Sequence, residues 1–156
     1  MNPILREQLR RAQIHLERRN RGENSQPHLD GVHGLDGTET FNKTESGIVV
    51  PVPDGLDYFP FQRAGIEFLA SRKEALLADD MGLGKSVQIC GLSNNLPKIA
   101  YCLVVCPASL KSTWHRELNR WLCPPAARSI LVCDGSTAEL GNPGIVIVNY
   151  DLLGRF

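Results

Sequence analysis

The sequence predicts an α/β fold with a parallel sheet, preceded by an amphipathic helix and a flexible linker. Two observations predict the sheet: apolar runs of strand length alternate with helical patterns, and a Gly-Lys-Ser loop lies between a predicted strand and a predicted helix. Strands that alternate with helices form βαβ units, whose strands run parallel. With 156 residues, the chain is long enough for one such core and too short for two.

The composition is that of an ordinary globular protein, with 42% hydrophobic and 22% charged residues. No apolar run reaches the ~18 residues of a membrane span, and the Arg-rich N-terminus lacks the apolar stretch of a secretory signal. We therefore expect an intracellular protein without a membrane partner. It would lie in the cytoplasm or nucleoid of a prokaryote or virus, or in the nucleus of a eukaryote.

Residues 1–20 predict a basic amphipathic helix, since Leu5, Leu9, Ala12 and Leu16 recur at helical spacing. Its outer face carries arginines, which could contact DNA phosphates or simply be solvated while the helix docks on the core. Residues 21–57 are rich in glycine, proline, aspartate and asparagine, which predicts a largely irregular linker with a short extended piece at 48–52. The compact domain is expected over residues 58–156.

The elements of that domain follow in order along the chain. We predict helices at 60–70, 84–92 and 109–122, and strands at 74–78, 101–106, 130–133 and 145–149. Pro60 suits the first turn of its helix. The helix at 109–122 is expected to be capped by Ser109 and to end before Pro124. Its expected packing face consists of Leu110, Trp114, Leu118 and Trp121. Because both tryptophans lie on this face with the leucines, core packing is more plausible for them than base stacking.

The five cysteines predict buried free thiols rather than a metal site or disulfides. Most lie inside apolar runs, and Cys102 and Cys106 flank three apolar residues of a predicted strand. Zinc ligands are instead typically paired on turns, with histidines nearby.

The segment from Asp79 to Ser86 predicts a phosphate-binding loop. Gly82 and Gly84 allow backbone N–H groups to form an anion-binding nest, to which the following helix adds its positive dipole end. Lys85 would reach the β- and γ-phosphates of ATP, and the Ser86 hydroxyl would ligate Mg²⁺. The general pattern has glycine where this chain has Asp79, and a glycine-rich structural turn is the alternative interpretation.

The loop closely resembles motif I of Swi/Snf-type superfamily-two helicase-like ATPases, in which Asp-Glu-Met-Gly-Leu-Gly-Lys-Thr is usual. Three further segments match this family in order: Phe59 to Ile66 before motif I, Val104 to Leu110 with 114–117 as motif Ia, and Ile145 to Asp151 as motif Ib. The resemblance covers about residues 58–156 and implies the N-terminal part of a RecA-like lobe. Pro-Phe-Gln-Arg-Ala-Gly with Ala-Asp-Asp-Met-Gly looks most like the annealing-helicase branch.

The resemblance implies a role for each matching residue. Gln62 would read the adenine edge, although it could also be a solvated helix residue. The ATP-binding loop would comprise Asp80, Met81, Gly82, Leu83, Gly84, Lys85 and Ser86. Duplex or branched DNA would contact Pro107, Ser109, Lys111, Asn149 and Tyr150. The first three of these also fit an ordinary strand-to-helix turn, since they follow a strand and open a helix.

No catalytic residue is predicted within the chain. A motor of the resembled family splits ATP with an Asp-Glu pair on a later strand and with arginines from a second lobe, and neither occurs in this sequence. Asp134 ends an apolar strand, but it lies between motifs Ia and Ib and is followed by glycine. We therefore expect a lobe truncated before the Asp-Glu box and inactive alone. The alternatives are a split motor completed by a second polypeptide and a non-catalytic DNA- or protein-binding module with a vestigial loop.

Overall fold

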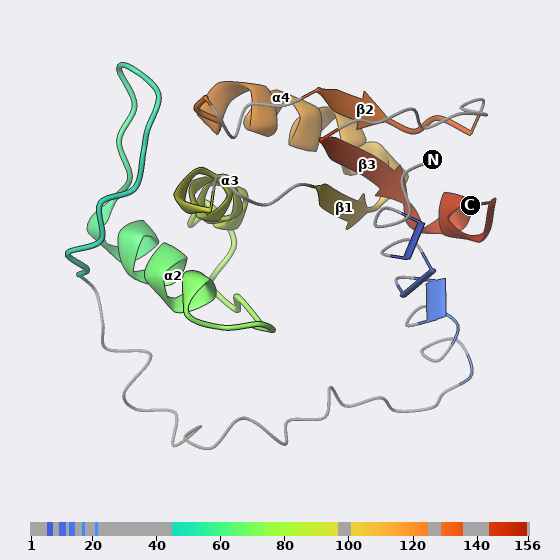
Figure 1. Cartoon of the computed structure of the whole chain (residues 1–156), viewed down its shortest axis with the longest axis horizontal. Helices are drawn as coiled ribbons and strands as arrows, with labels where there is room; N and C mark the ends of the chain where they lie inside the picture. The colour runs from blue at the N-terminus through green and yellow to red at the C-terminus, as the bar shows by residue number, and fades with distance from the viewer. Residues whose placement is uncertain are drawn as a thin grey trace. The chain divides into compact units, whose positions relative to one another are not determined.

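The computed structural model describes residues 45–96, 101–124, 129–135 and 144–155. Within the first 21 residues it describes Arg6, Glu7, Arg10, Arg11, Gln13, Ile14, Glu17 and Arg21. The chain divides into two compact units (Figure 1). The sheet unit holds residues 1–35, 101–112 and 129–156, and the helical unit holds residues 36–100 and 113–128. Most of the predicted linker lies outside the described residues.

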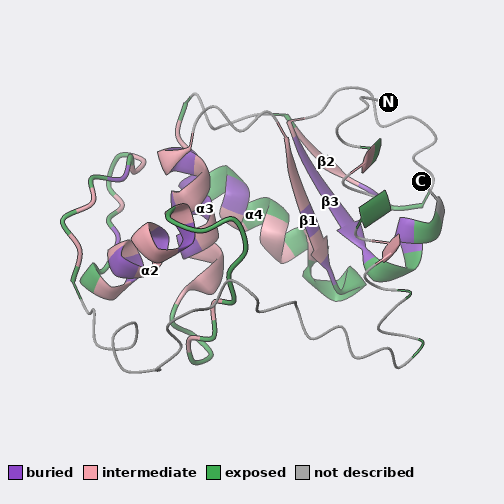
Figure 2. Cartoon of the chain, turned by 60° about the horizontal axis from the view of Figure 1, so that its bottom comes forward, coloured by how far each residue is buried: buried purple, intermediate pink, exposed green. Residues whose placement is uncertain are grey.

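The sheet unit contains three parallel strands in the order β1-β3-β2, which confirms the predicted parallel sheet. They are β1 (Cys102–Cys106), β2 (Ile130–Val132) and β3 (Ile145–Asn149), close to the expected bounds. All five residues of β3 are buried, whereas β2 is only partly buried (Figure 2). This difference follows from the order of the strands, because β3 has a neighbour on both sides.

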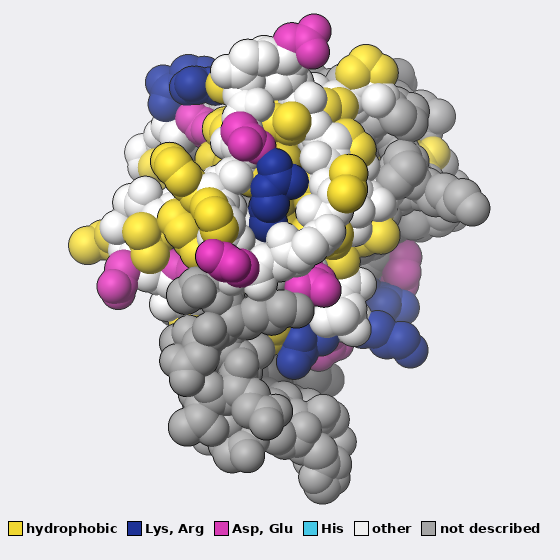
Figure 3. Space-filling model, turned by 90° about the vertical axis from the view of Figure 1, so that its left-hand side faces the viewer, with side chains coloured by type: hydrophobic (Ala, Val, Ile, Leu, Met, Phe, Trp, Pro, Cys, Tyr) yellow, Lys and Arg dark blue, Asp and Glu magenta, His cyan; other side chains and the backbone are white. Residues whose placement is uncertain are grey.

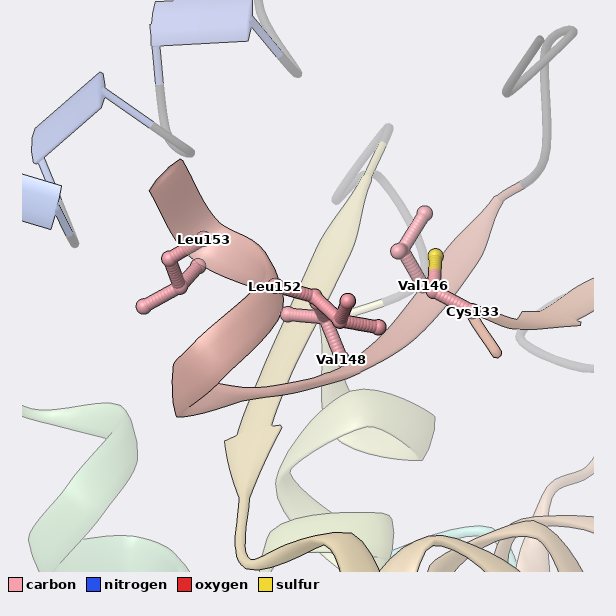
Figure 4. Close-up of a cluster of buried hydrophobic side chains, with 5 residues drawn as sticks. All are labelled: Cys133, Val146, Val148, Leu152 and Leu153. Atoms are coloured by element: carbon pink, nitrogen blue, oxygen red, sulfur yellow. The ribbon is translucent and has the colours of Figure 1, made fainter. Parts of the chain in front are cut away.

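One hydrophobic cluster lies over this sheet. It joins Cys133, Val146 and Val148 to Leu152 and Leu153 of the 3₁₀ helix η2 (Tyr150–Arg155), as Figure 4 shows. Each buried valine or leucine contributes about 1.5–3 kcal/mol. The cluster therefore fixes η2 against the strand that precedes it.

In the helical unit, α2 (Pro60–Ala70) packs against α3 (Lys85–Asn95). The bounds of α2 are those predicted, with Pro60 in its first turn. The two helices approach closely at Gly91, where an added Cβ would lie 2.4 Å from Ile66 Cδ1. None of the helices in the described part of the chain is long and apolar enough to cross a membrane.

The helix predicted at 109–122 begins later than expected. A 3₁₀ turn η1 (Ala108–Leu110) precedes α4 (Lys111–Trp121), so Ser109 lies inside the turn and is not the cap of α4. The predicted packing face is also shorter, because Leu118 and Trp121 are buried but Leu110 is 44% exposed. Trp121 stacks on Tyr58 with ring centroids 5.4 Å apart.

The strand predicted at 74–78 is wrong. These residues form no strand, and Leu76 is 82% exposed. The apolar run Leu76-Leu77-Ala78 suggested a buried strand, but a strand also needs a neighbour to accept and donate its backbone hydrogen bonds. Among the described residues, all strand pairing is within β1, β2 and β3. The phosphate loop therefore follows an irregular segment.

Asn94, which sequence reasoning did not single out, connects four parts of the helical unit. Its Nδ2 donates to the Pro51 carbonyl, the Tyr58 hydroxyl and the Trp121 carbonyl at 2.8–3.2 Å. Its Oδ1 accepts the Cys123 N–H at 2.9 Å. Through Pro51, residues from the expected linker are thus attached to the helices.

The described residues of the predicted N-terminal helix between Arg6 and Glu17 have helical backbone. Glu7 accepts hydrogen bonds from Arg10 and Arg11 at 2.8–3.3 Å. These bonds to Arg10 and Arg11 lower the pKa of the Glu7 carboxyl to about 2. Part of the basic face is therefore paired within the helix. Its residues Arg18 and Arg19 lie outside the described residues.

Candidate functional site

The phosphate loop, residues 79–86, lies in the helical unit and leads directly into α3. Gly82 has a φ of 88° and Gly84 a φ of 75°, the left-handed region that only glycine adopts without strain. Gly84 is the N-cap of α3, and the N–H groups of the next residues have no partner within the helix. The loop thus presents backbone donors at the positive end of a helix dipole, which favours binding of an anion.

Lys85 lies folded back over the loop. Its Nζ donates to the carbonyl oxygens of Asp79 at 2.7 Å and Asp80 at 2.9 Å. A lysine ammonium has three N–H donors, so these two bonds leave one for a phosphate oxygen. Ser86 is the second residue of α3 and is partly buried, beside Lys85.

Gln62 ties the loop to the beginning of α2. Its Nε2 donates to the Leu83 carbonyl at 3.2 Å, and its Oε1 accepts the Phe59 N–H at 3.1 Å. The side chain is only 5% exposed, which excludes the solvated alternative. The role of Gln62 at the adenine edge stays a prediction.

The remaining loop residues differ in exposure. Met81 is 97% and Leu83 40% exposed, and Asp80 is exposed as well.

Figure 3 shows hydrophobic side chains on one face of the molecule, interspersed with acidic side chains and with Lys or Arg. Exposed hydrophobic residues also occur elsewhere in the helical unit, at Val49, Phe59 and Leu76.

Sequence reasoning missed Gln88, which is fully buried in α3 and donates from Nε2 to Asp79 Oδ2 at 2.7 Å. A glutamine in a helix carries no local signal of burial. The close approach of α2 at Gly65 could have indicated it, but that approach is a property of the tertiary structure.

A second group of predicted site residues meets in the sheet unit, at the carboxyl ends of the strands. Lys111 Nζ donates to the Cys133 carbonyl at 2.6 Å and to Asn149 Oδ1 at 3.1 Å. Asn149 Nδ2 in turn donates to Asp151 Oδ2 at 3.0 Å. Lys111, which follows β1 in the chain, therefore connects to the carboxyl ends of both β2 and β3.

The other predicted DNA contacts are accessible. Pro107 and Ser109 are exposed, and Tyr150 is 41% exposed at the start of η2. Asp134 is exposed one residue after Cys133. Burial raises the pKa of the Cys133 thiol despite the nearby Lys111 ammonium. Cys106 is also buried, and all five cysteines are free thiols.

Comparison with known proteins adds evidence that is independent of this geometry. The family model described as SNF2-related domain matches residues 61–155, which include both groups of site residues. The chain belongs to the Swi/Snf family. The match confirms the resemblance drawn from the four motifs and is consistent with a partial RecA-like α/β domain.

Several curated members of the Swi/Snf family are similar to this chain. A protein of Xenopus tropicalis is 41% identical over 65% of the chain and 11% of its own length; its name is SWI/SNF-related matrix-associated actin-dependent regulator of chromatin subfamily A-like protein 1. The DNA annealing helicase and endonuclease ZRANB3 of Bos taurus is 32% identical over 65% of the chain and 10% of its own length. The DNA excision repair protein ERCC-6-like of Bos taurus is 36% identical over 57% of the chain and 8% of its own length. The chain thus matches about a tenth of each relative.

Proposed function

We propose that this chain is the ATP-binding and DNA-contacting part of the first lobe of a Swi/Snf-type DNA translocase. The observation that carries the proposal is the phosphate loop, where two glycines with positive φ precede a Gly-Lys-Ser helix start within a family match. A structural turn would not need a lysine and a serine at the first positions of the helix.

In this proposal ATP binds with Mg²⁺ at residues 80–86. Backbone N–H groups of the loop hold the phosphates, and the remaining Lys85 donor reaches the β- and γ-phosphates. The Ser86 hydroxyl ligates Mg²⁺ carried by ATP. The hydrogen bonds of Gln62 to Phe59 and Leu83 leave one amide N–H and one oxygen lone pair unused. With these two groups Gln62 recognises the adenine edge.

DNA, duplex or branched, is proposed to bind along the carboxyl ends of β1 and β3. Exposed Pro107, Ser109 and Tyr150 would contact the backbone. Lys111 donates a hydrogen bond to Asn149, so we propose that these two residues contribute to DNA binding mainly by holding this surface in place. The similarity to a protein named DNA annealing helicase supports the annealing-helicase branch and an intracellular location, nuclear in a eukaryote.

Hydrolysis by residues 1–156 alone is proposed to be negligible, because they contain no adjacent Asp-Glu pair. The arginine that closes on the γ-phosphate in phosphoryl-transfer sites is alone worth ~10³–10⁵ in rate. A second polypeptide supplying these groups would complete the motor.

The experiment is a titration of a fluorescent ATP analogue with Mg²⁺, followed by an ATPase assay with and without fork DNA. The wild-type chain is expected to bind, whereas Lys85→Ala weakens binding about tenfold or more through loss of a charge-assisted contact. Lys73→Ala, at an exposed position outside the loop, is the matched control and keeps wild-type affinity. In the ATPase assay, wild type and Lys85→Ala are expected to coincide.

Two results would change the proposal. Turnover clearly above the Lys85→Ala blank would contradict the proposed inactivity, and Asp134 would become the carboxylate to mutate. DNA binding without ATP binding would favour a binding module with a vestigial loop. In that case charge reversal of Arg10, Arg11, Arg18 and Arg19 should abolish DNA binding while Lys85→Ala leaves it intact.

A further inference from the structure

The buried amide of Gln88 lies behind the phosphate loop. Its side chain has no exposed surface, and its Nε2 donates to Asp79 Oδ2 at 2.7 Å. A hydrogen bond from a buried donor to a carboxylate is among the stronger polar contacts in a protein. Asp79 is only partly buried, so the bond joins the interior of the helical unit to the loop surface.

The other end of the Gln88 amide is not satisfied. Among the described residues, Oε1 is the one buried side-chain oxygen or nitrogen without a hydrogen-bond partner. A buried acceptor left unpaired lowers stability, and an apolar side chain of similar length, such as methionine, would avoid that cost. Packing alone therefore does not explain a glutamine here, whereas its bond to Asp79 does.

Asp79 connects this bond to Lys85. Gln88 holds the carboxylate of Asp79, and the backbone carbonyl of Asp79 accepts a hydrogen bond from Lys85 Nζ at 2.7 Å. Asp79 also occupies the position at which the general phosphate-loop pattern has glycine. We propose that Gln88 and Asp79 are a positioning pair that holds the loop and Lys85 ready for ATP without contacting the nucleotide.

The neighbouring helix α2 restricts where the Gln88 amide can lie. A Cβ added at Gly65 would be 1.8 Å from Gln88 Oε1 and 2.9 Å from its Cδ. Gly65 therefore leaves the space that the amide needs beside α2. Substitution of this glycine should displace Gln88 and, through Asp79, disturb the loop.

The proposal rests on the proposed ATP binding, so its test uses two readouts. The first is the affinity for the fluorescent ATP analogue with Mg²⁺. The second is amide hydrogen exchange of residues 79–86, which reports the order of the loop without any nucleotide. Thermal unfolding of each variant separates loss of loop order from loss of the fold.

Gln88→Met loses the hydrogen bond to Asp79 but also removes the unpaired oxygen, so it is expected to unfold close to the wild-type temperature. It should nevertheless bind the analogue about tenfold more weakly, the loss expected for one charge-assisted bond, with faster exchange in the loop. Asp79→Ala should weaken binding to a similar extent but unfold at a lower temperature, because it leaves the buried Gln88 Nε2 without its acceptor. Asp79→Asn, which keeps an acceptor oxygen, should recover most of the affinity. Gly65→Ala should weaken binding as well.

The double variant Asp79→Ala with Gln88→Met decides whether the two residues act together. If the two residues act as a pair, the double variant should lose no more affinity than either single variant. If they contribute independently, the fold-losses of the two single variants should multiply in the double variant. Asn94→Ala is the control: Asn94 is buried and polar in the same helix, so its loss should lower the unfolding temperature without changing affinity or loop exchange.

Wild-type affinity and wild-type loop exchange in Gln88→Met would overturn the proposal, as would multiplicative losses in the double variant. If the wild-type chain binds no ATP, the proposed function fails. Amide hydrogen exchange then tests the positioning pair without nucleotide. Wild-type exchange of residues 79–86 in Gln88→Met would reject the pair, and faster exchange would support it.

Discussion

Gly82 and Gly84 offer a matched pair of substitutions in the phosphate loop. Both have positive φ, but their surroundings differ: nothing lies within 4 Å of a Cβ added at Gly82, whereas a Cβ at Gly84 would be 2.5 Å from Gln62 Nε2. Gly82→Ala should therefore cost only the strain of a left-handed alanine, about 1–2 kcal/mol. Gly84→Ala should cost this strain and also displace Gln62 from its bonds to Leu83 and Phe59.

Each displaced bond contributes about 0.5–1.5 kcal/mol, so Gly84→Ala should destabilise the chain by about 1–3 kcal/mol more than Gly82→Ala. Urea denaturation of both variants measures the difference. Adding Gln62→Ala removes the obstructing amide, so in that background the cost of Gly84→Ala should fall to that of Gly82→Ala. Equal destabilisation by the two single variants, or no relief from Gln62→Ala, would refute the reasoning.

Three further predictions concern other parts of the chain. Asn94→Ala leaves the Trp121 carbonyl and the Cys123 N–H without this partner, whereas Tyr58 and Pro51 keep the hydrogen bond between them. It should lower the free energy of unfolding by about 2–3 kcal/mol in urea denaturation; a change below the experimental error would contradict the role of Asn94. Lys111→Met should cost about 1.5–3 kcal/mol in the same assay, whereas Ser109→Ala, at an exposed position, should be nearly neutral. Reduced DNA affinity of Lys111→Met at unchanged stability would instead make Lys111 a direct DNA contact. Burial raises the pKa of the Cys106 and Cys133 thiols, so unfolded thiols ionise first and stability should fall as pH rises above roughly 8.5. Urea midpoints at pH 7 and 9.5 measure this, and a flat profile would contradict it.

The elements that were predicted correctly are those with a strong local signal. Pro60 and the apolar spacing of 60–70 defined α2, and the uninterrupted apolar run at 145–149 defined β3. Two of the errors involve segments whose state depends on distant residues. The run at 74–78 has strand composition but no ladder partner among the described residues, and Ser109 became part of a 3₁₀ turn.

The candidate site divides in the same way. Glycines followed by Lys85 and Ser86 predicted a phosphate loop, and the structure has positive φ at both glycines and a helix beginning at Lys85. The partners of the polar side chains were not predictable. The role of Gln62 at the adenine edge stays a prediction, but its hydrogen bonds to Leu83 and Phe59 were not foreseen, and Gln88 was not recognised at all.

The sequence by itself determined the family, the order of helices and strands apart from the false strand at 74–78, and the residue types available to hold a phosphate. These features follow from spacing within one segment, where periodicity and glycine reveal burial and backbone conformation. Only the tertiary structure decided the strand order β1-β3-β2, the burial of Gln88 and Asn94, and the pairing of Lys111 with Asn149. The physical reason is that a side-chain hydrogen bond depends on two residues brought together by packing, and no single segment of sequence carries that information.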